Sequence, residues 1–176
     1  SQIIGEAKDY NDAIYSTIKE IAERTGWEYG EIWIPDPEKQ SLEYGPVYYL
    51  NSDDLMPMME ASRNRKFQYG ESLPGKIWKD KKISWLPNVQ DTTEKIFPRN
   101  KVAAQAGLKA ALAVPIIDKD QVIAVMAFLT SRPAPPDENI IQIISSVSGQ
   151  IGTLIQRKKA DDTLRSLLES APDAIL

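Results

Sequence analysis

The stretch that decides the fold is Phe67–Asp91, FQYGESLPGKIWKDKKISWLPNVQD. Gly70 interrupts an incoming strand, and Pro74 sets the backbone for the first turn of a short helix. Gly75 allows another segment to approach that helix closely. Basic residues follow where cations favour a helix C-terminus, and an apolar strand then runs until Pro87 stops it. The stretch therefore predicts a strand, a short helix and a second strand in succession.

Further strands are predicted on both sides of this stretch. Residues 27–35 alternate between apolar and polar types, and residues 41–50 follow after a polar turn, which predicts an antiparallel hairpin. Residues 108–117 and 121–130 are apolar at nearly every position, as expected for central strands that are covered on both faces. The chain thus contains a second, more buried hairpin.

Helices are predicted at both ends of the chain. Apolar residues recur at helical spacing up to Thr25, and Gly26 ends this first helix. Asp137 can cap a long helix over residues 138–170. We expect the first and last helices to pack on one face of the sheet and the short helices on the other.

The order of these motifs resembles the GAF domain, a small sensory module of signalling proteins. The resemblance rests on G-x-x-LPG-x-I-W from Gly70, on WLPNVQD, and on AGLKAALAVPI and VIAVMAFL, and it runs roughly from Asp12 to Arg157. It implies an α/β (α+β) fold: an antiparallel sheet of about five or six strands, helices on both faces and a long C-terminal helix.

The resemblance also implies a division of the chain. We predict a GAF domain with its N-terminal helix over residues 1–157, a signalling-helix linker over 158–170, and the start of a PAS domain over 171–176, where ESAPDAIL resembles a PAS opening. The first residue is Ser1 and the last lies inside an apolar run, which predicts a fragment of a larger protein. By family analogy, the parent is expected to be a cytoplasmic sensor histidine kinase with a downstream PAS and output domain.

Composition excludes several kinds of chemistry. The chain has no Cys and no His, so a thioether-linked bilin, a thiolate metal site and the usual haem or zinc ligands are not expected. A net charge of -4 argues against nucleic-acid binding. The apolar runs are far shorter than the ~20 residues that span a bilayer, so no membrane insertion is expected. No catalytic constellation is recognisable, and this part of the parent is not expected to be an enzyme.

A noncovalent ligand pocket is the main functional candidate. The resemblance implies a pocket bordered by Trp85, with the segment from Phe97 to Lys101 as a lid, and Arg99 and Lys101 could neutralise an anionic ligand. The other predicted pocket residues are Leu86, Asn88, Ala113 and Pro115. Each has a simpler interpretation: aromatic residues on strands are usually core, exposed cations are usually solvated, and Asn88 can serve a turn.

A homodimer through the terminal helices is the second candidate. Apolar residues of the last helix follow steps of four and three, which predicts a parallel helical seam and an output helix. The predicted seam residues are Ile140, Ile144, Val147, Ile151, Leu154, Leu164 and Leu168. Two functions remain open: a module that senses a noncovalent small ligand and relays the signal through a helical dimer, or a ligand-free dimerisation and spacer module.

Overall fold

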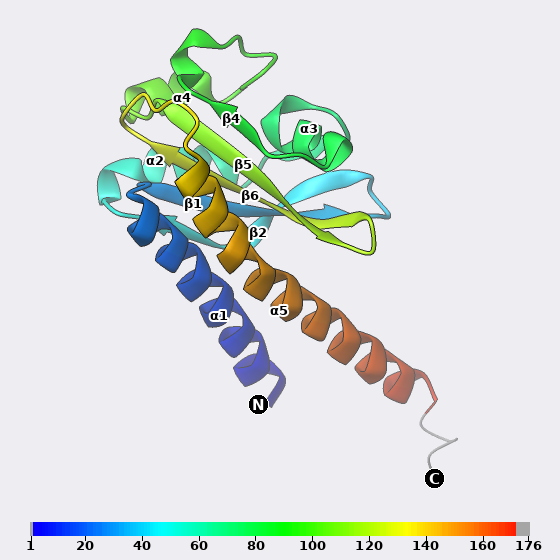
Figure 1. Ribbon diagram of the computed structural model, residues 1–176. Helices are drawn as coiled ribbons and strands as arrows, with labels where there is room; N and C mark the ends of the chain where they lie inside the picture. Colours follow the sequence, from blue (N-terminus) through cyan, green and yellow to red (C-terminus); the bar gives the residue numbers. More distant parts are fainter. Residues whose placement is uncertain (1, 172–176) are drawn as a thin grey trace.

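The computed structural model describes residues 2–171 and shows one sheet flanked by helices on both faces (Figure 1). The elements in chain order are α1 (Gln2–Thr25), β1 (Tyr29–Asp36), β2 (Ser41–Leu50), α2 (Met56–Ser62), β3 (Lys66–Gln68), α3 (Ser72–Asp80), β4 (Ser84–Leu86), α4 (Asn100–Gln105), β5 (Ala110–Asp118), β6 (Gln121–Thr130) and α5 (Glu138–Ser170). Two short 3-10 helices, η1 (Asp53–Leu55) and η2 (Val89–Asp91), precede α2 and follow β4.

The sheet has six antiparallel strands in the order β3-β2-β1-β6-β5-β4. Both predicted hairpins are present, and β1 and β6 pair at the centre. The β1–β2 register shifts between Glu31 and Trp33, opposite Gly45–Val47, which places a bulge at Pro46. A side chain at Gly45 would place its Cβ 2.4 Å from Cγ2 of Ile32, which explains glycine there.

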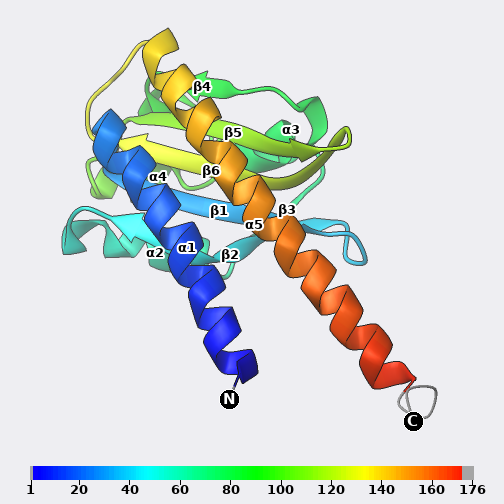
Figure 2. The ribbon, with the colours of Figure 1, turned by 60° about the horizontal axis from the view of Figure 1, so that its bottom comes forward.

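Two separate hydrophobic clusters lie on the two faces of the sheet. Helices α1 and α5 cover one face, side by side and antiparallel, as Figure 2 shows. Helices α2, α3 and α4 cover the other face. Alternate residues of each strand supply the two clusters, so Ile32 of β1 belongs to the first and Tyr29 and Trp33 belong to the second. The predicted fold class and the predicted distribution of helices are confirmed.

The diagnostic stretch folds as a tight turn around Gly75. The Gly70 amide donates a 2.9 Å hydrogen bond to the Gly75 carbonyl, and a Cβ at Gly75 would lie 2.3 Å from the carbonyl oxygen of Gln68. Lys81 ends α3 in the left-handed conformation, with a φ of 57°. The Leu-Pro-Gly sequence therefore lets α3 pack directly on the end of β3.

Helix α5 continues without a break across the predicted boundary between residues 157 and 158. Asp137 caps it by accepting a hydrogen bond from the Asn139 amide at 2.8 Å. The predicted start of a PAS domain falls almost wholly on residues 172–176, which lie outside the described part of the chain. Across residues 2–171, no helix combines the length and apolar character needed to cross a membrane.

The apolar stripe of α5 serves the chain's own core over most of its predicted seam. Ile144, Val147 and Ile151 are buried against the sheet and α1, and Ile140 and Leu154 pack at the margin of the same cluster. Ile144, Val147 and Ile151 therefore serve the chain's own core, whereas Ile140 and Leu154 keep part of their surface exposed, and the homodimer through α5 stays a prediction. Leu164 and Leu168, which are 59% and 51% exposed, lie on the part of α5 beyond this cluster.

Candidate ligand site around Arg99

The structure divides the predicted pocket residues between the two faces of the sheet. Trp85 packs on the α1/α5 side, where its ring meets Trp27 edge to face with 5.4 Å between centroids. Its indole Nε1 donates a 2.7 Å hydrogen bond to the carbonyl of Ala134. The sheet therefore separates Trp85 from Phe97 and Arg99, which are buried on the opposite side.

The remaining predicted residues have distinct environments. Leu86 and Ala113 pack in the same cluster as Phe97. Asn88 caps η2 by accepting a hydrogen bond from the Gln90 amide at 3.0 Å, so its turn role is present. The Lys101 side chain is 83% exposed and pairs with Glu94 on the surface, and Pro115 borders a hollow beneath α5. Of the predicted set, Phe97 and Arg99 form the centre of a site.

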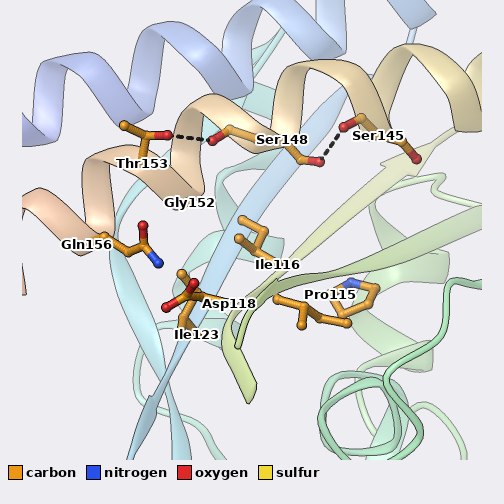
Figure 3. Close-up of a pocket in the computed structure, with 11 residues that line it drawn as sticks. Pro115, Ile116, Asp118, Ile123, Ser145, Ser148, Gly152, Thr153 and Gln156 are labelled. Atoms are coloured by element: carbon orange, nitrogen blue, oxygen red, sulfur yellow. Dashed lines mark hydrogen bonds between the residues drawn. The ribbon is translucent and has the colours of Figure 1, made fainter. Parts of the chain in front are cut away.

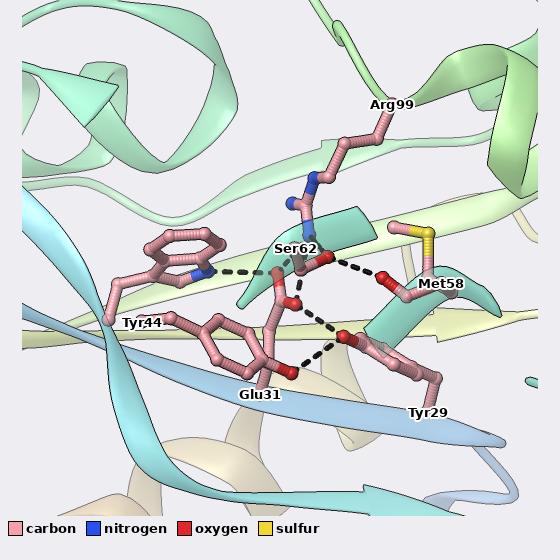
Figure 4. Close-up of polar contacts among 7 residues, drawn as sticks. Tyr29, Glu31, Tyr44, Met58, Ser62 and Arg99 are labelled. Carbon is pink, nitrogen blue, oxygen red and sulfur yellow. Dashed lines mark hydrogen bonds and ion pairs between the residues drawn. The ribbon is translucent and has the colours of Figure 1, made fainter. Parts of the chain in front are cut away.

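Arg99 forms a fully buried ion pair with Glu31 (Figure 4). Its Nη1 donates to both carboxylate oxygens of Glu31, at 2.8 and 2.9 Å, and lies 2.8 Å from Oγ of Ser62. Both charged side chains are 0% exposed. Arg99 comes from the loop before α4, Glu31 from β1 and Ser62 from α2, so the pair joins three elements that are distant in sequence.

Glu31 is held by two further donors from its own strand. Tyr29 donates its hydroxyl hydrogen to Oε2 at 2.7 Å, and Trp33 donates from Nε1 to Oε1 at 2.9 Å. The Tyr29 hydroxyl also lies 2.9 Å from the hydroxyl of Tyr44. These contacts satisfy a carboxylate that would otherwise be costly to bury.

Three aromatic rings surround the Arg99 guanidinium. Its Cζ lies 5.1 Å from the ring centroid of Phe97, 5.4 Å from that of Trp33 and 5.7 Å from that of Phe67. Such distances allow cation–π attraction, which is stronger where water is excluded. The rings therefore stabilise the charge and give the site apolar walls.

One edge of the guanidinium has no partner among the described residues. Nε and Nη2 of Arg99 are buried and make no hydrogen bond with any of residues 2–171. Buried polar groups are normally satisfied, and each orphaned donor costs roughly 1 to 3 kcal/mol. This free edge is the feature of the site that most needs a chemical explanation.

The buried charges also perturb the two tyrosines. Burial raises the pKa of Tyr29 well above its ordinary value, and the nearby Glu31 carboxylate raises it further. Burial likewise raises the pKa of Tyr44, again with a contribution from Glu31. Both hydroxyls therefore stay protonated and available as donors over the physiological range.

Comparisons with known proteins agree with this architecture. The family model of the GAF domain matches residues 11–156. The chain belongs to the GAF domain family. No curated protein sequence matches it.

Solved structures share the GAF fold at low sequence identity. The GAF domain of an Acinetobacter phosphoenolpyruvate-protein phosphotransferase is 16% identical with a TM-score of 0.68, covering 88% of this chain and 86% of that one. A domain of a putative two-component sensor histidine kinase from Sinorhizobium meliloti is 15% identical with a TM-score of 0.66, covering 88% and 97%. A NreA protein of Staphylococcus aureus, mutated in its nitrate-binding site, is 18% identical with a TM-score of 0.61, covering 78% and 97%.

Glu31 is the residue of this GAF domain that sequence analysis missed. Glu31 lies two residues from Tyr29 and two from Trp33 on β1, so all three side chains lie on the same face of the sheet. Tyr29 and Trp33 both point into the core beneath α2–α4. A carboxylate between two buried aromatic residues on one face of a strand needs a cationic partner. The alternation along β1 was the available signal for a buried carboxylate, but it does not identify Arg99 as the partner.

A hollow of the GAF domain lies between the β5–β6 hairpin and α5, with a volume of about 260 Å³ (Figure 3). Ser148 and Thr153 line it, but their hydroxyls donate to carbonyls of their own helix at 3.1 and 3.2 Å. A Cβ at Gly152 would come within 3.2 Å of Ile116. The hydroxyls of Ser148 and Thr153 are thus engaged within the helix, while the side chains of Asp118 and Gln156 point into the hollow (Figure 3).

Proposed function

We propose that this GAF domain is a sensory module that binds a small ligand noncovalently beside Arg99 and relays its occupancy to α1 and α5. The observation that supports it is the buried guanidinium edge without a protein partner, enclosed by three aromatic rings. A built polar site inside an otherwise apolar core is the usual pattern of a specific small-molecule pocket. The nitrate-binding site named for the S. aureus relative is consistent with a small ligand in this fold.

The relay would pass through β1, which is a single layer between the site and α1. Glu31 faces Arg99, while the adjacent Gly30 faces α1. A Cβ at Gly30 would lie 2.7 Å from Cγ2 of Ile18, so α1 rests almost directly on the strand backbone. A shift of β1 on ligand binding would therefore be passed to α1 and, through their packing, to α5.

Native mass spectrometry tests ligand binding. Protein purified under native conditions should carry a mass excess that disappears on denaturation and is absent from Arg99→Gln. Lys101→Gln is the matched control, because Lys101 is exposed and lies outside the buried cluster. A chain of bare mass, with no stabilisation by any small-molecule fraction of a cell extract, would refute the sensory proposal.

The wider context of the proposal is a sensor histidine kinase in the cytoplasm, with a PAS domain after α5 and no enzymatic activity in this chain. The structural similarity to a domain of a putative sensor histidine kinase supports this choice. In the parent, inserting four residues after Lys159 should change output more than inserting seven, because seven residues restore the heptad phase. Equal effects of the two insertions would contradict a relay through α5.

A ligand-free dimerisation and spacer module is the second candidate. The exposed residues Leu164, Leu167 and Leu168 at the end of α5 favour it, since they offer apolar surface beyond the domain core. We expect a homodimer that weakens with dilution and with Leu164→Glu in light scattering. A strict monomer at high concentration would refute this candidate and leave the ligand proposal intact.

A further inference from the structure

We propose that the ligand taken up beside Arg99 is a small, planar, monovalent oxyanion of the carboxylate or nitrate class. This inference rests on the ligand-binding function proposed above. Its starting point is that Nη1 is fully engaged with Glu31 and Ser62, whereas Nε and Nη2 have no partner. Nε–H and one Nη2–H point in parallel along the same edge of a guanidinium, and this fork matches two oxygen atoms of a planar oxyanion.

The charge of the cluster limits the ligand to a single negative charge. Among residues 2–171, Arg99 is the one cationic side chain in the buried set, and Glu31 already balances its charge. A monovalent ligand would leave the cluster of Arg99, Glu31 and ligand with one net negative charge, because both anions would share a single guanidinium. A dianion such as sulfate would leave two, in surroundings from which water is largely excluded, and the desolvation penalty rises steeply with charge.

The walls of the site limit the ligand to a small size. Phe97, Trp33 and Phe67 all lie within 6 Å of the guanidinium centre, and Trp33 and Phe97 are fully buried. These rings lie around a guanidinium whose Nε and Nη2 have no hydrogen-bond partner among residues 2–171. With three rings this close to the guanidinium, a ligand at its edge would have to be an ion of only a few heavy atoms.

The competing explanation is that the ion pair only fastens the loop before α4 to the sheet. Phe97 and Arg99 both come from this loop, and Glu31 fixes it to β1. That explanation accounts for Nη1 but leaves Nε and Nη2 without a role. It also predicts that anions stabilise the wild type and a variant without the Nε–Nη2 edge, such as Arg99→Lys, equally.

The experiment compares salt-dependent thermal stability of the 176-residue chain and of Arg99→Lys. Lysine keeps the charge but lacks the fork. Sodium nitrate, formate, sulfate and chloride are titrated at equal ionic strength, with far-UV circular dichroism to confirm folding. We expect a saturable rise of the wild-type melting temperature with nitrate, formate or both, and at least a tenfold weaker apparent affinity in Arg99→Lys. Lys101→Gln, altered only at the surface, should behave as wild type.

A measurement on the wild type keeps the test valid if Arg99→Lys does not fold. The Nε–H of Arg99 is buried, so in a ¹⁵N spectrum of arginine side chains its signal should exchange slowly and shift on titration with nitrate or formate. A response to nitrate alone or to formate alone identifies which of the two anions the site takes. A shift that saturates supports the proposal, and an unchanged Nε–H signal with both anions overturns it.

The outcomes also separate this inference from the sensory function. Sulfate binding as tightly as nitrate and formate overturns the monovalent planar class, while the site itself stands. A neutral ligand found by native mass spectrometry and lost in Arg99→Gln, with no anion response, likewise overturns the class alone. Absence of any bound ligand together with absence of any anion response overturns both.

Discussion

The face of the sheet beneath α1 and α5 is filled mainly by aliphatic side chains, whereas the face beneath α2–α4 encloses an ion pair, two tyrosine hydroxyls and several aromatic rings. The first gains its stability mainly from the close packing of apolar groups. The second contains charges whose burial is tolerable only because each has defined partners.

This difference indicates a division of tasks within one small domain. Buried ion pairs contribute little net stability compared with apolar residues of similar volume, so a carboxylate and a guanidinium in the core call for another explanation. On the α1/α5 face, the residue types are explained by the need to pack stably and to hold two long helices in a fixed position. On the other face, the directional groups are those that the proposed ligand would contact.

The largest effect is expected from Glu31→Gln. It leaves the buried Arg99 without a counterion, which typically costs about 3 to 5 kcal/mol of unfolding free energy. Urea denaturation measures it. The matched control is Glu43→Gln, which removes a surface carboxylate paired with Lys39 and Lys66 and should cost less than about 1 kcal/mol. Equal losses in the two variants would remove the distinction between a buried and a surface pair.

A somewhat smaller effect is expected on the opposite face from Ile144→Ala. The side chain is fully buried between α5 and the sheet, so truncation should cost about 2 to 5 kcal/mol through lost burial and a residual cavity. Ile117→Ala, at a residue that is 46% exposed, should change stability by no more than about 0.5 kcal/mol. Anion binding should survive Ile144→Ala, and its loss would show that the two faces are not separable.

Alkaline pH should weaken the polar face in particular. Because the pKa values of Tyr29 and Tyr44 are raised in the folded state, their contribution is complete below pH ~10, the unfolded pKa, and is lost as the pH rises above it. The unfolding free energy should fall by up to about 1.4 kcal/mol per pH unit for each tyrosine. Urea titrations at a series of pH values should show a shallower slope in Tyr44→Phe. Tyr69→Phe, at a 54% exposed position, is the control and should retain the wild-type slope.

The smallest effect is expected from Trp85→Phe. The change removes the hydrogen bond to the Ala134 carbonyl and should cost about 1 kcal/mol. Since Trp85 lies on the α1/α5 side, nitrate and formate titrations should give wild-type affinity. A tenfold loss of affinity in a folded Trp85→Phe protein would return Trp85 to the ligand site and contradict the separation of the faces.

Local sequence signals were sufficient for the elements of the fold. Periodicity and turn residues identified both hairpins and both long helices, and Asp137 and Gly26 marked helix ends correctly. The face of the sheet on which Trp85 lies could not be predicted, because β4 has only three residues and shows no clear alternation. Its pairing sets Trp85 opposite Leu112 and Leu86 opposite Ala111, and a shift of one residue would exchange the two faces.

The site was predictable only in part, because its two charged members are 68 residues apart. Arg99 and Phe97 were identified as ligand candidates, but nothing local shows that a cation in a polar, turn-rich segment is buried. The burial of Glu31 can be inferred only from its position between two aromatic residues on the same face of β1. The stripe on α5 posed a similar difficulty, since spacing shows that Ile144 and Ile151 share a face without showing what covers it.

The length of α5 beyond the core has a mechanical consequence. Ile155 is the last fully buried residue of the helix, which ends at Ser170. At 1.5 Å per residue, that overhang is roughly 22 Å long. A tilt of about 5° at its base would carry the tip through about 2 Å, as for a stiff rod of this length. In the proposed relay the overhang would act as a lever arm, and it would turn a displacement of β1 too small to disturb the core into one that a domain attached at its tip would register.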